Sequence, residues 1–220
     1  MTEELYKFIV DIKHHAYRKK VDVDFAKEFS KENLPYAERI TRRFEKMCEL
    51  QTPTILDGEE IVFIRTTEKA GDVLNEKEWK EYEKKYGHIH ELGYTSNLCG
   101  DYATIISEGL IKTKERATEY GKREIDAIIA LAERYEKEAE RMGRKDIEET
   151  LKVVPKYPAK TFRQALQFFR ILHFAVWLEG CYHNTVGRFD VYMYLYLKND
   201  IEKGVITKDE AQALLDDFFL

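Results

Sequence analysis

The sequence predicts a mainly α-helical protein with a few short strands. Apolar residues recur at helical spacing through most of the chain, and charged residues fill the opposite positions. Three segments have the spacing of a capping box, in which a polar residue precedes a helix and Glu or Gln follows three positions later; they begin at Asn75, Thr161 and Thr207. The best strand candidate is the run Ile-Val-Phe-Ile at 61–64.

Each expected helix follows from its own apolar spacing and its stop signals. Leu5 and Phe8 share one face of the first helix, and the basic residues near position 20 suit its end. Pro35 suits the first turn of another helix, Gly143 ends the longest one, and Pro155 ends the next. The expected helices cover 3–20, 22–33, 35–50, 75–87, 103–110, 114–142, 146–153, 162–178 and the residues from 207 onward.

Composition excludes several classes of protein. The 220 residues include 36 Lys and Arg against 41 Asp and Glu, a formal net charge of −5, so no basic surface predicts nucleic-acid binding. No apolar run reaches the roughly 18 residues that a membrane span needs. The acidic, polar start at 1–4 has no secretory signal. We therefore expect a cytoplasmic protein whose three cysteines, Cys48, Cys99 and Cys181, are reduced.

Two features predict that the sequence is part of a longer polypeptide. The helix expected over 162–178 is apolar around almost its whole circumference, and such a helix is buried on most of its surface. The other expected elements offer few partners to cover it. The last expected helix, which starts at Thr207, has no Gly, Asn or Pro stop before Leu220. We expect residues 1–220 to be the N-terminal portion of a single domain, truncated after Leu220.

The segment 187–196 is the strongest functional candidate. It places Arg188 and Asp190 two positions apart, directly before a dense aromatic run. One interpretation is structural, with the two side chains bonding to neighbouring groups near a helix start. The other is a polar floor to an apolar substrate pocket, where Asp190 accepts a hydrogen bond from a substrate hydroxyl and Tyr182 and His183 converge on the same space. An acid beside such donors suits the elimination of water from a diol.

Other His and Cys residues support weaker hypotheses. His88 and His90 lie two apart, but no further ligands follow at a recognised metal-binding spacing, so we expect no metal site and prefer a lid or pocket wall over 88–101. A catalytic thiol at Cys99 or Cys181 would need a partner that lowers its pKa. His173 falls within the apolar helix, and we expect it to be a hydrogen-bonded core histidine.

Three ordered blocks carry a resemblance to a known family. Residues 158–167 are Pro-Ala-Lys-Thr-Phe-Arg-Gln-Ala-Leu-Gln, residues 187–194 are Gly-Arg-Phe-Asp-Val-Tyr-Met-Tyr, and residues 200–211 are Asp-Ile-Glu-Lys-Gly-Val-Ile-Thr-Lys-Asp-Glu-Ala. The blocks and their spacing resemble the glycyl radical enzymes, the family of pyruvate formate-lyase and glycerol dehydratase. Residues 52–65 and the segment at Gly87 are similar to that family more weakly.

The resemblance implies the N-terminal helical part of a ten-stranded α/β barrel of the pyruvate formate-lyase type. Members of that family carry a glycyl radical near the C-terminus, installed by a separate S-adenosylmethionine-dependent activating enzyme, and a cysteine at the barrel centre acts on the substrate. The radical motif Arg-Val-x-Gly-Tyr and the central cysteine loop are absent here. We therefore expect no catalytic residue in this chain and no turnover by the chain alone. The complete enzyme would cleave a C–C or C–O bond of a small substrate anaerobically. Its partner would be the activating enzyme. The complete enzyme could also form a homodimer, and the resemblance does not decide this.

The resemblance also assigns Tyr182, His183, Arg188 and Asp190 to the substrate-binding wall, and favours a diol or similar hydroxylated substrate over pyruvate. Two departures from the family pattern adjoin this wall: Val191 stands in place of the usual Gln, and Leu195 in place of the usual Pro. These departures leave open an altered pocket. The alternative hypothesis is a non-catalytic helical scaffold or partner module derived from the same family, and a stand-alone metalloenzyme that uses His88 and His90 is a third.

Overall fold

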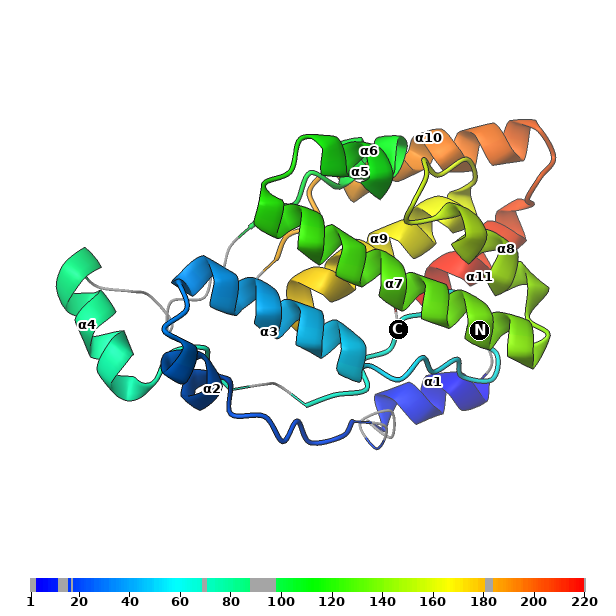
Figure 1. The fold of residues 1–220 in the computed structure, drawn as a ribbon. Helices are drawn as coiled ribbons and strands as arrows, with labels where there is room; N and C mark the ends of the chain where they lie inside the picture. Colours follow the sequence, from blue (N-terminus) through cyan, green and yellow to red (C-terminus); the bar gives the residue numbers. More distant parts are fainter. Residues whose placement is uncertain are drawn as a thin grey trace.

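The computed structural model describes residues 3–11, 16, 18–68, 71–87, 98–180 and 184–219, without the side chains of Phe8 and Ile9. Within those residues the regular secondary structure is helical (Figure 1). The helices are α1 (Glu3–Val10), α2 (Phe25–Glu32), α3 (Tyr36–Leu50), α4 (Glu76–Tyr86), α5 (Tyr102–Glu108), α6 (Leu110–Glu115), α7 (Glu119–Met142), α8 (Lys145–Val153), α9 (Phe162–Leu178), α10 (Phe189–Glu202) and α11 (Lys208–Phe218).

The predicted capping residues start three of these helices. Asn75 forms a reciprocal capping box at α4, and Thr207 forms one at α11. Only half of the predicted box forms at α9: Thr161 accepts a hydrogen bond from the Gln164 N–H, but the Gln164 side chain accepts from the N–H of Lys160. Local sequence signals therefore set these helix starts.

Two predicted helices have different bounds. The helix expected over 3–20 ends at Val10, and Lys19 instead forms a parallel bridge with Thr67. The helix expected over 114–142 is split into α6 and α7. Thr118 separates them, because its side chain accepts from the Gly121 N–H and so caps a new helix.

Helix α7 lies at the centre of the packing. It runs side by side with α3 and α8, and α9 packs against it from behind (Figure 1). Its Tyr135 is fully buried, stacks on Phe63 with ring centroids 4.2 Å apart, and donates its hydroxyl to the Ile64 carbonyl at 3.1 Å. Figure 1 shows α4 projecting from the body of the molecule beside α2.

Helix α9 is covered by other parts of this chain. Phe162, Leu166, Phe168 and Ile171 are each at most 1% exposed, and the helix contacts α3, α5, α7, α8, α10 and α11. The expectation that the chain offers few partners for this helix is wrong. The exception is Trp177, which is 51% exposed near the end of the helix.

Helix α10 carries several exposed apolar side chains. Val191, Tyr194 and Leu195 are 50%, 57% and 67% exposed along this helix. The aromatic run that follows Asp190 therefore has an outward face as well as an inward one, on which Met193 is buried.

The run at 61–64 is not a strand in the described structure, which corrects the prediction of short strands. Its backbone groups bond to buried side chains rather than to a neighbouring strand. Gln167 accepts from the Val62 N–H at 2.9 Å and donates to the Val62 carbonyl at 3.0 Å. Asp217 Oδ2 accepts from the N–H groups of Glu60 and Ile61 at 3.0 and 2.8 Å. We call residues 60–62 the clamped segment.

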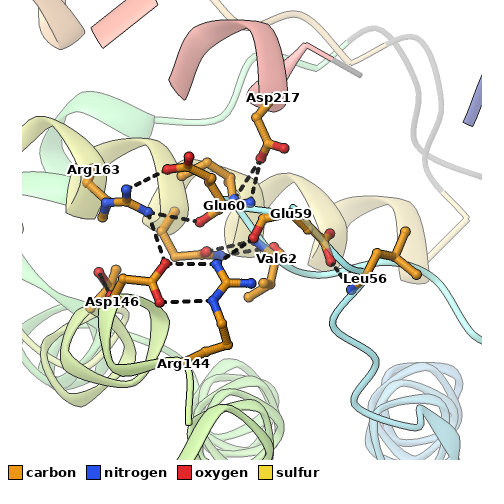
Figure 2. A network of polar contacts seen from close by, with 11 residues as sticks. Leu56, Glu59, Glu60, Val62, Arg144, Asp146, Arg163 and Asp217 are labelled. Atoms are coloured by element: carbon orange, nitrogen blue, oxygen red, sulfur yellow. Dashed lines mark hydrogen bonds and ion pairs between the residues drawn. The ribbon is translucent and has the colours of Figure 1, made fainter. Parts of the chain in front are cut away.

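A polar network holds the chain next to the clamped segment (Figure 2). Arg144 donates to the Glu59 carbonyl at 2.7 Å and pairs with Asp146 at 2.8 Å, while Arg163 pairs with Glu60 at 2.5 Å. Arg163 also reaches Asp146, at 3.7 Å. Side chains from α9 and α11, together with Arg144 at the N-cap of α8, therefore converge on residues 59–62, as Figure 2 shows.

Candidate functional site

A cavity of about 580 Å³ lies beside the clamped segment. Its walls come from α9, from residues 56–65, from the end of α11, and from Leu5 and Arg18 near the start of the chain. The volume is in the range of small-molecule binding sites. We take this cavity as the candidate functional site.

Aromatic rings form much of the cavity wall. Phe63 and Phe174 meet edge to face with centroids 5.4 Å apart, and Phe169 and Phe218 do so at 5.5 Å. Trp177 and Phe219, both largely exposed, complete this wall. An apolar body bound here would contact rings on several sides.

His173 supplies a neutral imidazole to the same wall. Its Nε2 accepts from the Trp177 indole N–H at 3.0 Å, and its Nδ1 lies 3.3 Å from the Tyr102 hydroxyl. Burial, and then the nearby Arg170, lower the pKa of His173. The prediction of a hydrogen-bonded histidine is confirmed, although the ring also borders the cavity.

Three charged residues meet deeper in the cavity. Arg170 donates to the Phe218 carbonyl and lies over the Phe218 ring, 5.0 Å from its centroid. Burial raises the pKa of Glu59 to about 8, and raises the pKa of Asp217 above its ordinary value. Glu59 is therefore mostly protonated at neutral pH, and the nearby Arg170 acts in the opposite direction to burial on the pKa of both acids.

The predicted pair Arg188 and Asp190 lies at the surface. The two side chains are 77% and 69% exposed and form two hydrogen bonds with each other, at 3.0 and 2.8 Å. The Arg188 partner lowers the pKa of Asp190. This geometry matches the structural interpretation of the pair. Neither residue is among those that line the cavity in the described structure.

The rest of that predicted wall is only partly described. Tyr182 and His183 lie outside the described residues, as do Cys181, His88 and His90. Two neighbours of the ion pair do reach the cavity region: Val186 lines it, and the Phe189 ring stacks on Phe218 with centroids 5.4 Å apart. The substrate-binding role of Tyr182, His183, Arg188 and Asp190 stays a prediction.

Several cavity residues were not foreseen from the sequence. Arg18, Arg65, Glu59 and Asp217 come from segments that no motif connects. Arg170 was the one with a visible signal, because it is a charged residue inside an almost wholly apolar helix. Such a residue rarely lies in a core without a partner.

Two other kinds of site are absent from the described part of the chain. No three His, Cys, Asp or Glu side chains there are grouped so that they could hold a metal ion. No helix there is long and apolar enough to cross a lipid bilayer. Cys48 is buried, with its pKa raised to about 12 by burial, and Cys99 is exposed; both are free thiols.

Comparisons with known proteins agree on one family. A trans-4-hydroxy-L-proline dehydratase from Clostridioides difficile is 31% identical over 104 residues, which is 41% of this chain and 13% of that protein. The glycyl radical subunit of a 4-hydroxyphenylacetate decarboxylase from Clostridioides difficile strain CD196 is 38% identical over 72 residues, 32% of this chain and 8% of that protein.

A solved structure shares the fold. The structure, described for 1,2-propanediol dehydration in Roseburia inulinivorans, matches 99% of this chain at a TM-score of 0.72 and 20% identity. The chain spans 37% of that protein. Residues 77–220 match the family model described as pyruvate formate lyase-like. The chain belongs to this family, that of the glycyl radical enzymes.

Proposed function

We propose that this chain is the N-terminal helical portion of a glycyl radical enzyme that removes water from a small hydroxylated substrate. The family match over 77–220 carries this proposal. Two relatives support C–O cleavage, since one is named as a hydroxyproline dehydratase and one structure is described for 1,2-propanediol dehydration. The decarboxylase relative makes C–C cleavage the competing reaction.

In this proposal the chain builds one wall of the substrate site, and the barrel is formed by other polypeptide of the complete enzyme. Asp190 accepts a hydrogen bond from a substrate hydroxyl, with Arg188 holding that carboxylate ionised, since their pairing lowers the pKa of Asp190. Tyr182 and His183 would adjoin the same hydroxyl groups. The glycyl radical, installed by an S-adenosylmethionine-dependent activating enzyme, would supply the radical chemistry from outside these residues.

The experiment is anaerobic expression of the complete native gene product with its activating enzyme. We expect the electron paramagnetic resonance doublet of a glycyl radical, and dehydration of 1,2-propanediol, glycerol or trans-4-hydroxyproline rather than decarboxylation of 4-hydroxyphenylacetate. Asp190→Asn should lower kcat while leaving the radical signal intact. Asp209→Asn, which changes an acid in the first turn of α11, is the matched control.

Three outcomes would count against the proposal. If the complete protein shows no radical signal and no turnover, the hypothesis of a non-catalytic scaffold is supported. A radical enzyme that only decarboxylates assigns the competing reaction. Equal kcat in the Asp190 and Asp209 variants removes Asp190 from the substrate wall.

A further inference from the structure

Two arginines from distant parts of the chain lie together at the cavity wall. Arg18 and Arg65 both line the cavity. The segments that carry them run side by side: the Lys19 N–H donates to the Thr66 carbonyl, and the Glu68 N–H donates to the Lys19 carbonyl, each at 2.9 Å. We call Arg18 and Arg65 the arginine pair.

Buried hydrogen bonds fix the backbone next to Arg65. Gln51, 1% exposed, accepts from the Thr66 N–H at 3.0 Å. The Thr66 hydroxyl accepts from the Thr52 N–H at 2.7 Å. The arginine pair therefore stands on a rigid support, and a ligand would meet a preorganised site rather than two free surface side chains.

The arginine pair has no counter-charge in the described structure. Neither guanidinium forms an ion pair there, and the Nε atoms of both are buried without a hydrogen-bond partner. Burial, then Arg18 and Arg43, lower the pKa of Arg65. Partly buried like charges without an acid destabilise the folded chain, and a bound anion would offset that cost.

The nearby acids do not supply that counter-charge. Glu59 is mostly protonated at neutral pH, and the charge of Asp217 interacts with Arg170, whereas burial, Arg18 and Arg43 shift the pKa of Arg65 and no acid among the described residues does. Arg170 adds a third positive charge to the cavity. The polar wall is thus cationic, while the remaining wall is apolar, with aromatic and aliphatic side chains.

We propose that this cavity binds a small organic anion, with a carboxylate or phosphate held by the arginine pair and an apolar body held against Phe63, Phe169 and Phe174. The proposal concerns binding by this chain and goes beyond the proposed dehydration, which does not require a charged substrate. Paired guanidinium groups are well suited to such oxyanions, because their N–H groups match two oxygens at once.

The test is calorimetric titration of the 220-residue chain with three probes of similar shape: benzoate, phenyl phosphate and neutral benzamide. Because hydrogen bonds to charged groups are stronger than neutral ones, we expect Arg65→Gln and Arg18→Gln each to weaken binding of the preferred anion about tenfold or more. Benzamide should bind the unaltered chain at least about tenfold more weakly. Whichever of benzoate and phenyl phosphate binds more tightly shows whether the site prefers a carboxylate or a phosphate.

Lys77→Gln is the matched control, since it removes the same charge from an 86% exposed side chain on α4. Thermal unfolding checks that each variant folds. Without added anion, Arg65→Gln should unfold at the same or a higher temperature, because a like-charge contact is removed. The preferred anion should raise the midpoint of the unaltered chain and of Lys77→Gln, but raise that of Arg65→Gln much less.

The proposal is wrong if benzamide binds as tightly as the anions, or if Lys77→Gln loses as much affinity as the arginine variants. It is also wrong if neither anion binds the unaltered chain at all. In that last case the arginine pair is better explained as a docking point for acidic side chains of another polypeptide segment. None of these results depends on radical formation, so they are separate from the test of dehydration.

Discussion

The clamped segment and the start of α10 both rely on polar side chains, but in opposite surroundings. At the clamped segment, Gln167 and Asp217 are 1% and 5% exposed and bond to backbone groups. At α10, Arg188 and Asp190 are mostly exposed and bond to each other. Buried polar groups are costly to leave unpaired, whereas exposed ion pairs compete with water. The clamped segment should therefore contribute more to the free energy of unfolding, whereas the exposed pair at the start of α10 can be used for binding at little cost in stability.

At constant pH, the largest loss of stability is expected from Gln167→Leu. This change leaves the Val62 N–H and carbonyl buried without partners, and each unsatisfied group costs about 1–3 kcal/mol. We expect the free energy of unfolding to fall by about 3 kcal/mol in urea titrations. Gln212→Leu, on the exposed side of α11, should change it little. Equal effects of the two changes would mean that the clamp contributes no particular stability.

A smaller loss is expected from Asp217→Ala, which removes the acceptor for the Glu60 and Ile61 N–H groups. The expected cost is about 2 kcal/mol, because removal also relieves the burial of an acid whose pKa is raised. Asp216→Ala is the neighbouring control. If the Asp216 variant is the less stable of the two, the assignment of Asp217 to the clamp is contradicted.

The pH dependence of stability should come partly from Glu59. Its folded pKa, about 8, lies above the ordinary value of 4.5 because of burial. The folded chain then binds the proton more tightly, so the contribution is complete below pH 4.5 and is lost as pH rises towards 8. Each pKa unit corresponds to about 1.4 kcal/mol. Glu59→Gln should flatten the decline in unfolding free energy between pH 5 and 8, and Glu76→Gln should not.

At the start of α10, Arg188→Ala should leave the urea midpoint unchanged, because its ion pair is exposed to solvent. In the complete enzyme the same change should lower kcat if the pair belongs to the substrate wall. A clear shift of the midpoint with unchanged turnover would reverse the contrast between the two regions.

Stability should also be little changed by Leu195→Lys on the outer face of α10, where the side chain is 67% exposed. The change should reduce self-association of the isolated chain and its binding of a hydrophobic dye, since it interrupts an exposed apolar surface. Sedimentation and dye fluorescence measure this. A chain that is monomeric and binds no dye before the change would contradict the expected association.

Local signals predicted much of the fold and little of the cavity. Capping residues such as Asn75 and Thr207 act within one turn, so the helices that they start were found from the sequence. The prediction of a strand at 61–64 is wrong because the partners of this run are remote in sequence: Gln167 lies 105 residues from Val62, and Asp217 lies 156 residues from Ile61. No local pattern reveals such contacts.

The candidate site shows the same limit. The motif at 187–190 predicts a site at Arg188 and Asp190, which are close in sequence and pair with each other. Arg18 and Arg65 meet only because two irregular segments run side by side. Their meeting depends on tertiary structure, and neither arginine stands out from the other basic residues of the chain. The family resemblance was found because its motifs are contiguous.

The long separation in sequence between Asp217 and its backbone partners also affects when these hydrogen bonds can form during protein synthesis. During translation, residues 60–62 leave the ribosome long before α11 exists, and their N–H groups must stay hydrated until that helix arrives. The hydrogen bonds of the Glu60 and Ile61 N–H groups therefore form only once Asp217 has been synthesised.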